Sequence, residues 1–118
     1  MNFQGRTVLV TGGTRGIGRG IVQVFARSGA QVAVNGTKID LCKEAAEEAD
    51  SLGGKGLAVP GDISKYESVR DIFKEVYDAF GELNYVSGFR RGSIYHGTVN
   101  KRDRWYRSAL IEICILRQ

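Results

Sequence analysis

The sequence is poor in the residues that build cross-linked or metal-bound frameworks. It contains two cysteines, Cys42 and Cys114, one histidine, His96, and one proline, Pro60. The cysteines lie far apart without motif spacing, which argues against a disulfide framework and indicates a reducing compartment. The histidine cannot complete a zinc site with these cysteines at any recognised ligand spacing, so we expect no metal.

Long apolar runs are also missing from the sequence. No stretch approaches the roughly 18 apolar residues of a membrane span, and no basic segment followed by an apolar one opens the chain. We therefore expect a cytoplasmic protein without a membrane segment. With 118 residues, of which 42% are hydrophobic and 25% charged, the composition fits one globular domain.

Glycine is abundant, with 16 residues, and a glycine-rich turn lies near the start of the chain. The β-branched run 7–11 before the turn predicts a buried strand, and apolar residues recur at helical spacing from Ile17 onward. Gly12, Gly16 and Gly18 therefore lie between a strand and a helix. Glycine lets the backbone approach a ligand closely, and the free N–H groups of a helix start attract anions. The turn predicts a site for a pyrophosphate.

The rest of the first 87 residues alternates between strand and helix patterns. Further strands are expected at about 30–35, 56–59 and 83–87, and further helices at about 37–52 and 64–80. This alternation predicts an α/β fold of Rossmann type, a doubly wound parallel sheet of about four strands in the order 3-2-1-4 with three helices.

The local patterns also give finer expectations. In the first helix, Ile21, Val24 and Phe25 recur on one side and are expected to bury against the sheet. Thr37 and Ser64 are expected to cap the second and third helices with their side chains.

The segment from Thr11 to Gly18, Thr-Gly-Gly-Thr-Arg-Gly-Ile-Gly, resembles the cofactor motif of the short-chain dehydrogenase/reductase family. These are NAD(P)-dependent oxidoreductases that transfer a hydride to or from carbonyls and alcohols, and the resemblance covers about residues 5–87. The sequence Gly61-Asp62-Ile63 resembles the acidic motif of the family after the third strand. The resemblance implies that the Asp62 carboxylate meets the adenine amino group and that Ile63 offers its backbone; Asp62 is alternatively a turn residue.

The end of the second strand bears on the choice of cofactor. NAD-specific sites place an acidic residue there, whereas this chain has Asn35, Gly36 and Thr37. Arg15 and Lys38 could pair with the 2′-phosphate that NADP(H) carries on its adenosine ribose and NAD(H) lacks. We therefore expect NADP(H) rather than NAD(H). Alternatively, Arg15 and Lys38 are solvated surface charges without a ligand. Asp40 is the alternative ligand of the ribose. The predicted cofactor-binding residues are Gly12, Thr14, Arg15, Gly16, Ile17, Gly18, Asn35, Thr37, Lys38, Asp62 and Ile63.

The resemblance stops after Val86. The Asn-Asn-Ala-Gly motif of the family is missing, and the sequence continues as Ser-Gly-Phe-Arg-Arg-Gly over residues 87–92. None of the five tyrosines has a lysine four positions later, as the catalytic pair of the family requires. The most similar pair is Tyr95 with Lys101, but six residues separate them instead of four, which does not suit the geometry of proton transfer. We therefore assign no catalytic residue and expect an exposed loop or short strand around Tyr95.

Composition changes at the same point. Residues 1–87 hold 10 basic and 11 acidic side chains, whereas residues 88–118 hold 7 and 2. Residues 101–107 place cations beside aromatic residues, which could bind the phosphates and stack on the bases of a nucleic acid. A solvated basic surface is the favoured interpretation. The apolar run 109–116 is either a fifth strand or a last helix. Together with an open edge of the fourth strand, it would form a surface for homo-oligomerisation or aggregation.

These observations predict a nucleotide-binding half-domain over residues 1–87 and a divergent tail over residues 88–118. We expect the NADP(H)-binding portion of a short-chain oxidoreductase, catalytically incomplete as it stands. The alternative is a non-catalytic nucleotide-binding or protein-interaction module. The change after Val86 suggests a truncated family member whose reading frame, exon choice or gene model diverges there, and the substrate cannot be inferred.

Overall fold

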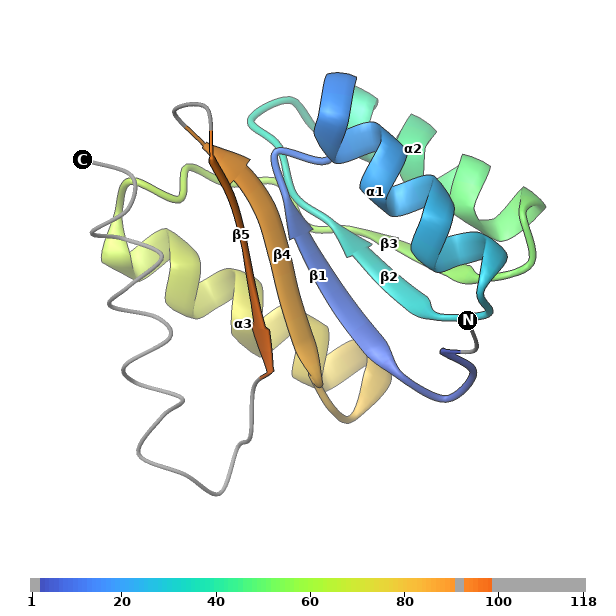
Figure 1. Cartoon of the computed structure of the whole chain (residues 1–118). Coiled ribbons are helices and arrows are strands. Elements are labelled where there is room, and N and C mark those ends of the chain that lie inside the picture. Colours follow the sequence, from blue (N-terminus) through green and yellow to red (C-terminus); the bar gives the residue numbers. More distant parts are fainter. Residues whose placement is uncertain (1–2, 91–92, 99–118) are drawn as a thin grey trace.

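A computed structural model of the chain describes residues 3–90 and 93–98 (Figure 1). Strands and helices alternate through most of this part, and a hairpin ends it. The elements are β1 Thr7–Thr11, α1 Gly16–Arg27, β2 Gln31–Val34, α2 Ile39–Ser51, β3 Lys55–Ala58, α3 Tyr66–Phe80, β4 Tyr85–Arg90 and β5 Ser93–Thr98.

The strands form one sheet in the order β3-β2-β1-β4-β5. The first four strands are parallel, with Val8 of β1 beside Val32 of β2 and Tyr85 of β4. This arrangement confirms the predicted Rossmann-type order 3-2-1-4 with three helices. β5 adds an antiparallel strand beside β4, so β4 is not the edge expected there, and among the described strands the edge is β5. The apolar run 109–116 is outside the described residues.

The sheet is covered on both faces (Figure 1). Because side chains alternate along a strand, Val8 and Val10 of β1 pack with residues of α1 and α2, whereas Leu9 between them packs with α3. All five residues of β1 are buried. Helices on both faces explain why this strand is a continuous apolar, β-branched run rather than an alternating one.

Helix α1 differs from the expected burial. Val22, Phe25 and Ala26 face the sheet and are buried, whereas Val24 is 49% exposed. The expectation that Val24 is buried was therefore wrong. The helix is apolar around more than half of its circumference, and the periodicity alone does not say which part of that circumference the sheet covers.

The expected helix caps were also wrong. Helices α2 and α3 have Lys38 and Lys65 at their N-cap positions, and neither makes a side-chain capping bond. Ser64 instead donates its hydroxyl to the Asp62 carboxylate over 2.7 Å. Since this bond closes a turn two residues before α3 begins, the Ser64 side chain is already engaged when the helix starts.

Candidate functional site

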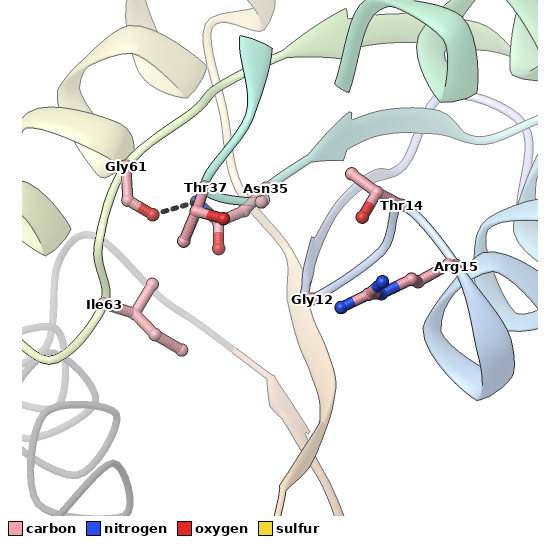
Figure 2. A pocket seen from close by; sticks show the side chains of 8 residues that line it. Gly12, Thr14, Arg15, Asn35, Thr37, Gly61 and Ile63 are labelled. Atoms are coloured by element: carbon pink, nitrogen blue, oxygen red, sulfur yellow. Dashed lines mark hydrogen bonds between the residues drawn. The ribbon is translucent and has the colours of Figure 1, made fainter. Parts of the chain in front are cut away.

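A cavity of about 220 Å³ lies at the carboxyl ends of β1, β2 and β3 (Figure 2). Parallel α/β sheets bind their ligands at this edge, next to the point where the strand order reverses. The loops that follow these three strands supply its walls. The residues lining the cavity are Gly12, Thr14, Arg15, Asn35, Gly36, Thr37, Gly61 and Ile63.

The glycine-rich turn forms one wall of this cavity. Gly12 and Gly16 have φ angles of 63°, a left-handed conformation that glycine adopts without strain. A Cβ on Gly18 would overlap the carbonyl oxygen of Gly12, so the turn closes onto the first turn of α1 only because Gly18 has no side chain. This glycine-rich turn, called the glycine cradle below, thus has room for a ligand that approaches the backbone.

The start of α1 is suited to an anion. Its N-cap residue, Arg15, has an extended backbone and makes no side-chain capping bond, and the first turn contains no acidic residue. The amide groups at a helix start lack intrahelical partners and carry the positive end of the helix dipole. A phosphate at this position would therefore meet free donors and a favourable field.

Asn35 connects the loops that line the cavity through hydrogen bonds. Asn35 is 2% exposed, and its side-chain amide donates to the carbonyl oxygens of Val59 and Gly61 at 3.0 and 3.2 Å. The Asn35 carbonyl accepts a 2.9 Å hydrogen bond from the amide of Gly13. These bonds join the ends of three strands, so the amide group of Asn35 has an architectural role in addition to its place in the wall.

A smaller cavity of about 60 Å³ adjoins the first and shares Thr14, Arg15 and Thr37 with it. Lys38 and Leu41 complete its lining. In Figure 2 the Arg15 guanidinium extends from the turn toward the cavity. Arg15 and Lys38 are both exposed, and neither forms an ion pair with any side chain that the structure describes. Two uncompensated cations therefore flank a polar recess.

Asp62 lies between two cavity residues but does not line the cavity itself. One of its carboxylate oxygens accepts hydrogen bonds from the amide and the hydroxyl of Ser64, at 2.9 and 2.7 Å. The expected turn role is thus present, and an adenine contact by the carboxylate stays a prediction. Ile63 is buried and lines the cavity.

Three other predicted residues do not line either polar cavity. Gly16 and Gly18 shape the turn, and Ile17 is 51% exposed and lines an apolar groove together with Val24. Sequence reasoning also missed the wall residues Gly36 and Gly61. The position of Gly36 directly after a strand was the signal that could have predicted its place in the cavity wall. A Cβ on Gly36 would lie 2.7 Å from the methyl group of Thr14.

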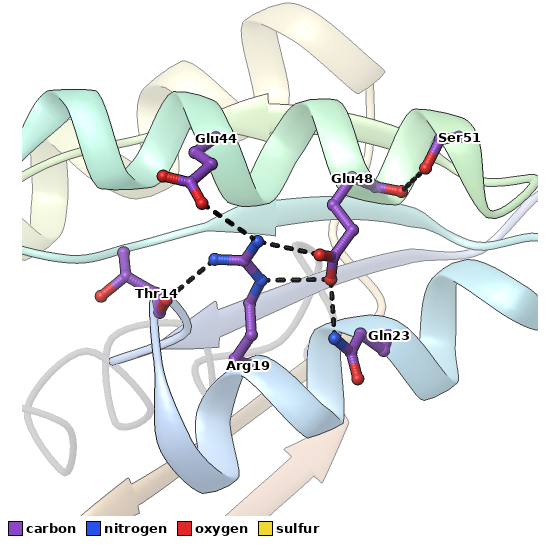
Figure 3. A network of polar contacts seen from close by, with 6 residues as sticks. All are labelled: Thr14, Arg19, Gln23, Glu44, Glu48 and Ser51. Carbon is purple, nitrogen blue, oxygen red and sulfur yellow. Dashed lines mark hydrogen bonds and ion pairs between the residues drawn. The ribbon is translucent and has the colours of Figure 1, made fainter.

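A half-buried ionic contact fixes the turn to the second helix (Figure 3). Arg19 donates to both carboxylate oxygens of Glu48, at 3.1 and 3.0 Å, and to the carbonyl of Thr14 at 3.0 Å. Gln23 adds a 2.7 Å hydrogen bond to Glu48. The bonds from Arg19 and Gln23 lower the pKa of the Glu48 carboxyl to about 2. Sequence reasoning missed this contact, because its partners come from different helices.

No tyrosine is among the described residues that line the two polar cavities. Tyr85, on β4, lines the apolar groove beside α1, and burial raises the pKa of its phenol. A tyrosine that acts as acid and base needs the opposite shift. Among residues 3–90 and 93–98, no three potential metal ligands gather, and no helix is long and apolar enough to cross a membrane.

Comparison with known proteins identifies the family to which this site corresponds. Residues 6–88 match the family described as short chain dehydrogenase. The chain belongs to the short-chain dehydrogenase family. Within it, an uncharacterized oxidoreductase of Thermotoga maritima is 35% identical over 101 residues, which are 86% of this chain and 39% of that protein. L-rhamnose-1-dehydrogenase of Scheffersomyces stipitis is 41% identical over 98 residues, and the match covers 38% of its length.

Solved structures of short-chain dehydrogenases share the fold. A hydroxysteroid dehydrogenase from Escherichia coli has a TM-score of 0.71 at 25% identity, over 74% of this chain and 37% of that one. L-Sorbose reductase from Gluconobacter frateurii, complexed with NADPH and L-sorbose, has a TM-score of 0.67 at 29% identity, over 71% and 32%. The chain therefore spans less than two fifths of the length of these family members.

Proposed function

We propose that this chain binds NADP(H) in the crevice at the carboxyl ends of β1, β2 and β3, as the nucleotide-binding portion of a short-chain oxidoreductase. The observation that carries the proposal is the joint placement of the glycine cradle, the uncapped start of α1 and the polar cavity. The cradle and the helix start suit a pyrophosphate. When bound, the nicotinamide group supplies or accepts the hydride in carbonyl reduction or alcohol oxidation.

The preference for NADP(H) is supported by charge. Arg15 and Lys38 flank the small recess, and no carboxylate lines it. A 2′-phosphate there would receive charge-assisted hydrogen bonds from Arg15 and Lys38, whereas a 2′-hydroxyl would find no acidic acceptor. Thr14 and Thr37 supply further hydroxyl groups to the same recess.

Catalytic incompleteness is a second part of the proposal. The family resemblance assigns proton transfer to a tyrosine with a lysine four residues later, and this sequence has no such pair. A chain that binds the cofactor without this pair lacks the group that donates or accepts the proton. We infer a nucleotide-binding unit at 1–87 with a distinct tail at 88–118, acting in the cytoplasm.

Affinity measurements on one arginine variant, with a lysine variant as control, test the proposed preference for NADP(H). Arg15→Ala should weaken NADPH binding by about 10-fold or more, because a hydrogen bond to a charged group contributes roughly 1.5–3 kcal/mol. NADH affinity should stay unchanged. Nicotinamide fluorescence titration measures both ligands.

Lys43→Ala is the matched control, since Lys43 is an exposed cation of α2 that lines neither cavity. It removes the same charge and should leave both affinities as they are. Equal losses of NADPH and NADH affinity in Arg15→Ala would contradict the role of Arg15 at the 2′-phosphate.

A further inference from the structure

We propose that Arg19 is a positioning residue of the glycine cradle: its guanidinium holds the Thr14 carbonyl, so that the next amide, that of Arg15, is directed at the ligand. The inference rests on the proposed function and adds a residue that is not among the described residues lining either polar cavity. Arg19 thus acts through the backbone of the turn and not by contact with the cofactor.

The guanidinium of Arg19 is fixed by its contacts with the second helix. Its Nε and Nη2 donate to the two carboxylate oxygens of Glu48, at 3.1 and 3.0 Å, and Gln23 donates to the same carboxylate at 2.7 Å (Figure 3). Because the guanidinium is planar and its donors form a rigid fork, these two bonds also set the direction of the third nitrogen, Nη1. Nη1 points at the Thr14 carbonyl oxygen and donates to it over 3.0 Å.

The Thr14 carbonyl depends on this bond for its orientation. Arg19 supplies the only hydrogen bond that this carbonyl accepts from the described residues. Without it, the carbonyl oxygen would have to find another donor, in water or elsewhere in the turn. The side chain of Arg19 is only 18% exposed, and its ion pair with Glu48 keeps the donor in place.

The orientation of the Thr14 carbonyl determines that of the following amide. The peptide bond between Thr14 and Arg15 is trans, and in a trans peptide the C=O and N–H groups point in opposite directions. Since the carbonyl is directed at Arg19, the Arg15 N–H points away from it. This N–H donates to no acceptor within residues 3–90 and 93–98, and Arg15 lines both polar cavities.

This orientation of the peptide suits an anionic ligand. The Arg15 amide gives a phosphate one more donor beside those at the start of α1. A peptide turned the other way would present the Thr14 carbonyl oxygen, whose negative partial charge repels a phosphate. The bond from Arg19 therefore selects the orientation that attracts the ligand.

Binding and NMR measurements on the 118-residue chain test this role. Arg19→Met keeps the apolar stem but removes every donor, and it should weaken NADPH binding by about 10-fold, because the hydrogen bond from the Arg15 amide to a charged group is lost. Arg19→Lys keeps the charge without the planar fork and should bind NADPH as weakly. The amide proton resonance of Arg15 should move downfield when NADPH is added to the unmodified chain, and in both variants this shift should be lost.

Gln23→Ala is the matched control. Gln23 holds the same Glu48 carboxylate as Arg19, but the bond to the Thr14 carbonyl comes from Arg19. This variant should lower the urea midpoint while the NADPH affinity stays within about twofold of that of the unmodified chain.

The outcomes separate the two proposals. If Arg19→Met lowers the urea midpoint but keeps the NADPH affinity within about twofold, or if Arg19→Lys binds as tightly as the unmodified chain, Arg19 contributes stability or charge alone. This inference is then overturned while the proposed function stands. The same follows if NADPH binds the unmodified chain without moving the Arg15 resonance, a result that does not depend on how the variants fold. If NADPH does not bind the unmodified chain, the proposed function fails and the inference fails with it.

Discussion

Helix α1 has two apolar sides with different surroundings. On one side Val22 and Ala26 face the sheet and are buried, whereas on the other Ile17 and Val24 are 51% and 49% exposed. The exposed side lines a groove of about 430 Å³ together with Tyr85 of β4. The same kind of side chain thus belongs to the core or to the surface according to what the fold places over it, and the helical period does not distinguish the two.

The difference follows from the width of the sheet. On this face α1 packs against β1 and β2 and reaches Tyr85 of β4 through Phe25, whereas α2 packs against β2 and β3 (Figure 1). The groove side of α1 lies next to Tyr85 and Ser87 of β4, and no helix of the described residues lines the groove besides α1. Substitutions at matched positions on the two sides of α1 can test this comparison.

The largest contrast is expected between Gly18 and Gly20. In Gly18→Ala the new methyl group would overlap the Gly12 carbonyl oxygen, so the turn must open. We expect a loss of about 3 kcal/mol in the free energy of unfolding and no measurable NADPH binding. Urea denaturation and nicotinamide fluorescence measure the two effects.

Gly20→Ala is the control on the groove side. A Cβ there meets no atom within 4 Å, and Gly20 lies inside the helix. Since alanine is the better helix former, this variant should gain roughly 0.5–1 kcal/mol and bind NADPH as before. Equal urea midpoints for the two variants would show that the close contact at Gly18 does not exist in solution.

A smaller contrast is expected between Val22 and Val24, two residues apart on the same helix. Val22→Ala removes two buried methyl groups and should lower the free energy of unfolding by about 2 kcal/mol. Val24→Ala removes the same atoms from a half-exposed position and should change it by less than about 0.5 kcal/mol. A comparable loss in both variants would mean that the groove side of α1 is covered in solution.

The sequence predicted what depends on neighbouring residues. β1 lies at Thr7–Thr11, as its β-branched run predicted. The lining of one cavity by Arg15, Thr37 and Ile63 followed from the glycine motif and the strand order, although their ligand contacts stay predictions.

The features that escaped prediction depend on distant residues. The side chain of Asn35 donates to carbonyls 24 and 26 residues further along the chain, and Arg19 pairs with Glu48 across 29 residues. A polar residue in a sequence does not show which distant carbonyl or carboxylate the fold will bring to it. The same reason explains the burial of α1, because the sheet that selects its buried side is built from separate segments.

The smallest expected effect concerns the polar side of α1, where Arg19 contacts Glu48 and Glu44. The pKa of Glu48 falls from an ordinary 4.5 to about 2, because Arg19 and Gln23 hydrogen-bond its ionised form. A carboxyl with a lowered pKa stabilises the fold above its unfolded pKa, and this contribution disappears as the pH falls from about 4.5 through about 2. Urea midpoints measured across this range should therefore fall less steeply for Glu48→Gln than for the unmodified chain.

Glu44→Gln is the matched control for this pH dependence. Glu44 approaches the same Arg19 guanidinium at 3.8 Å, but its side chain is 67% exposed. Exposed ion pairs contribute little because water screens them, so this variant should keep the pH dependence of the unmodified chain. If Glu44→Gln and Glu48→Gln flatten it equally, the effect comes from the net charge around Arg19 and not from the bidentate contact that ties α1 to α2.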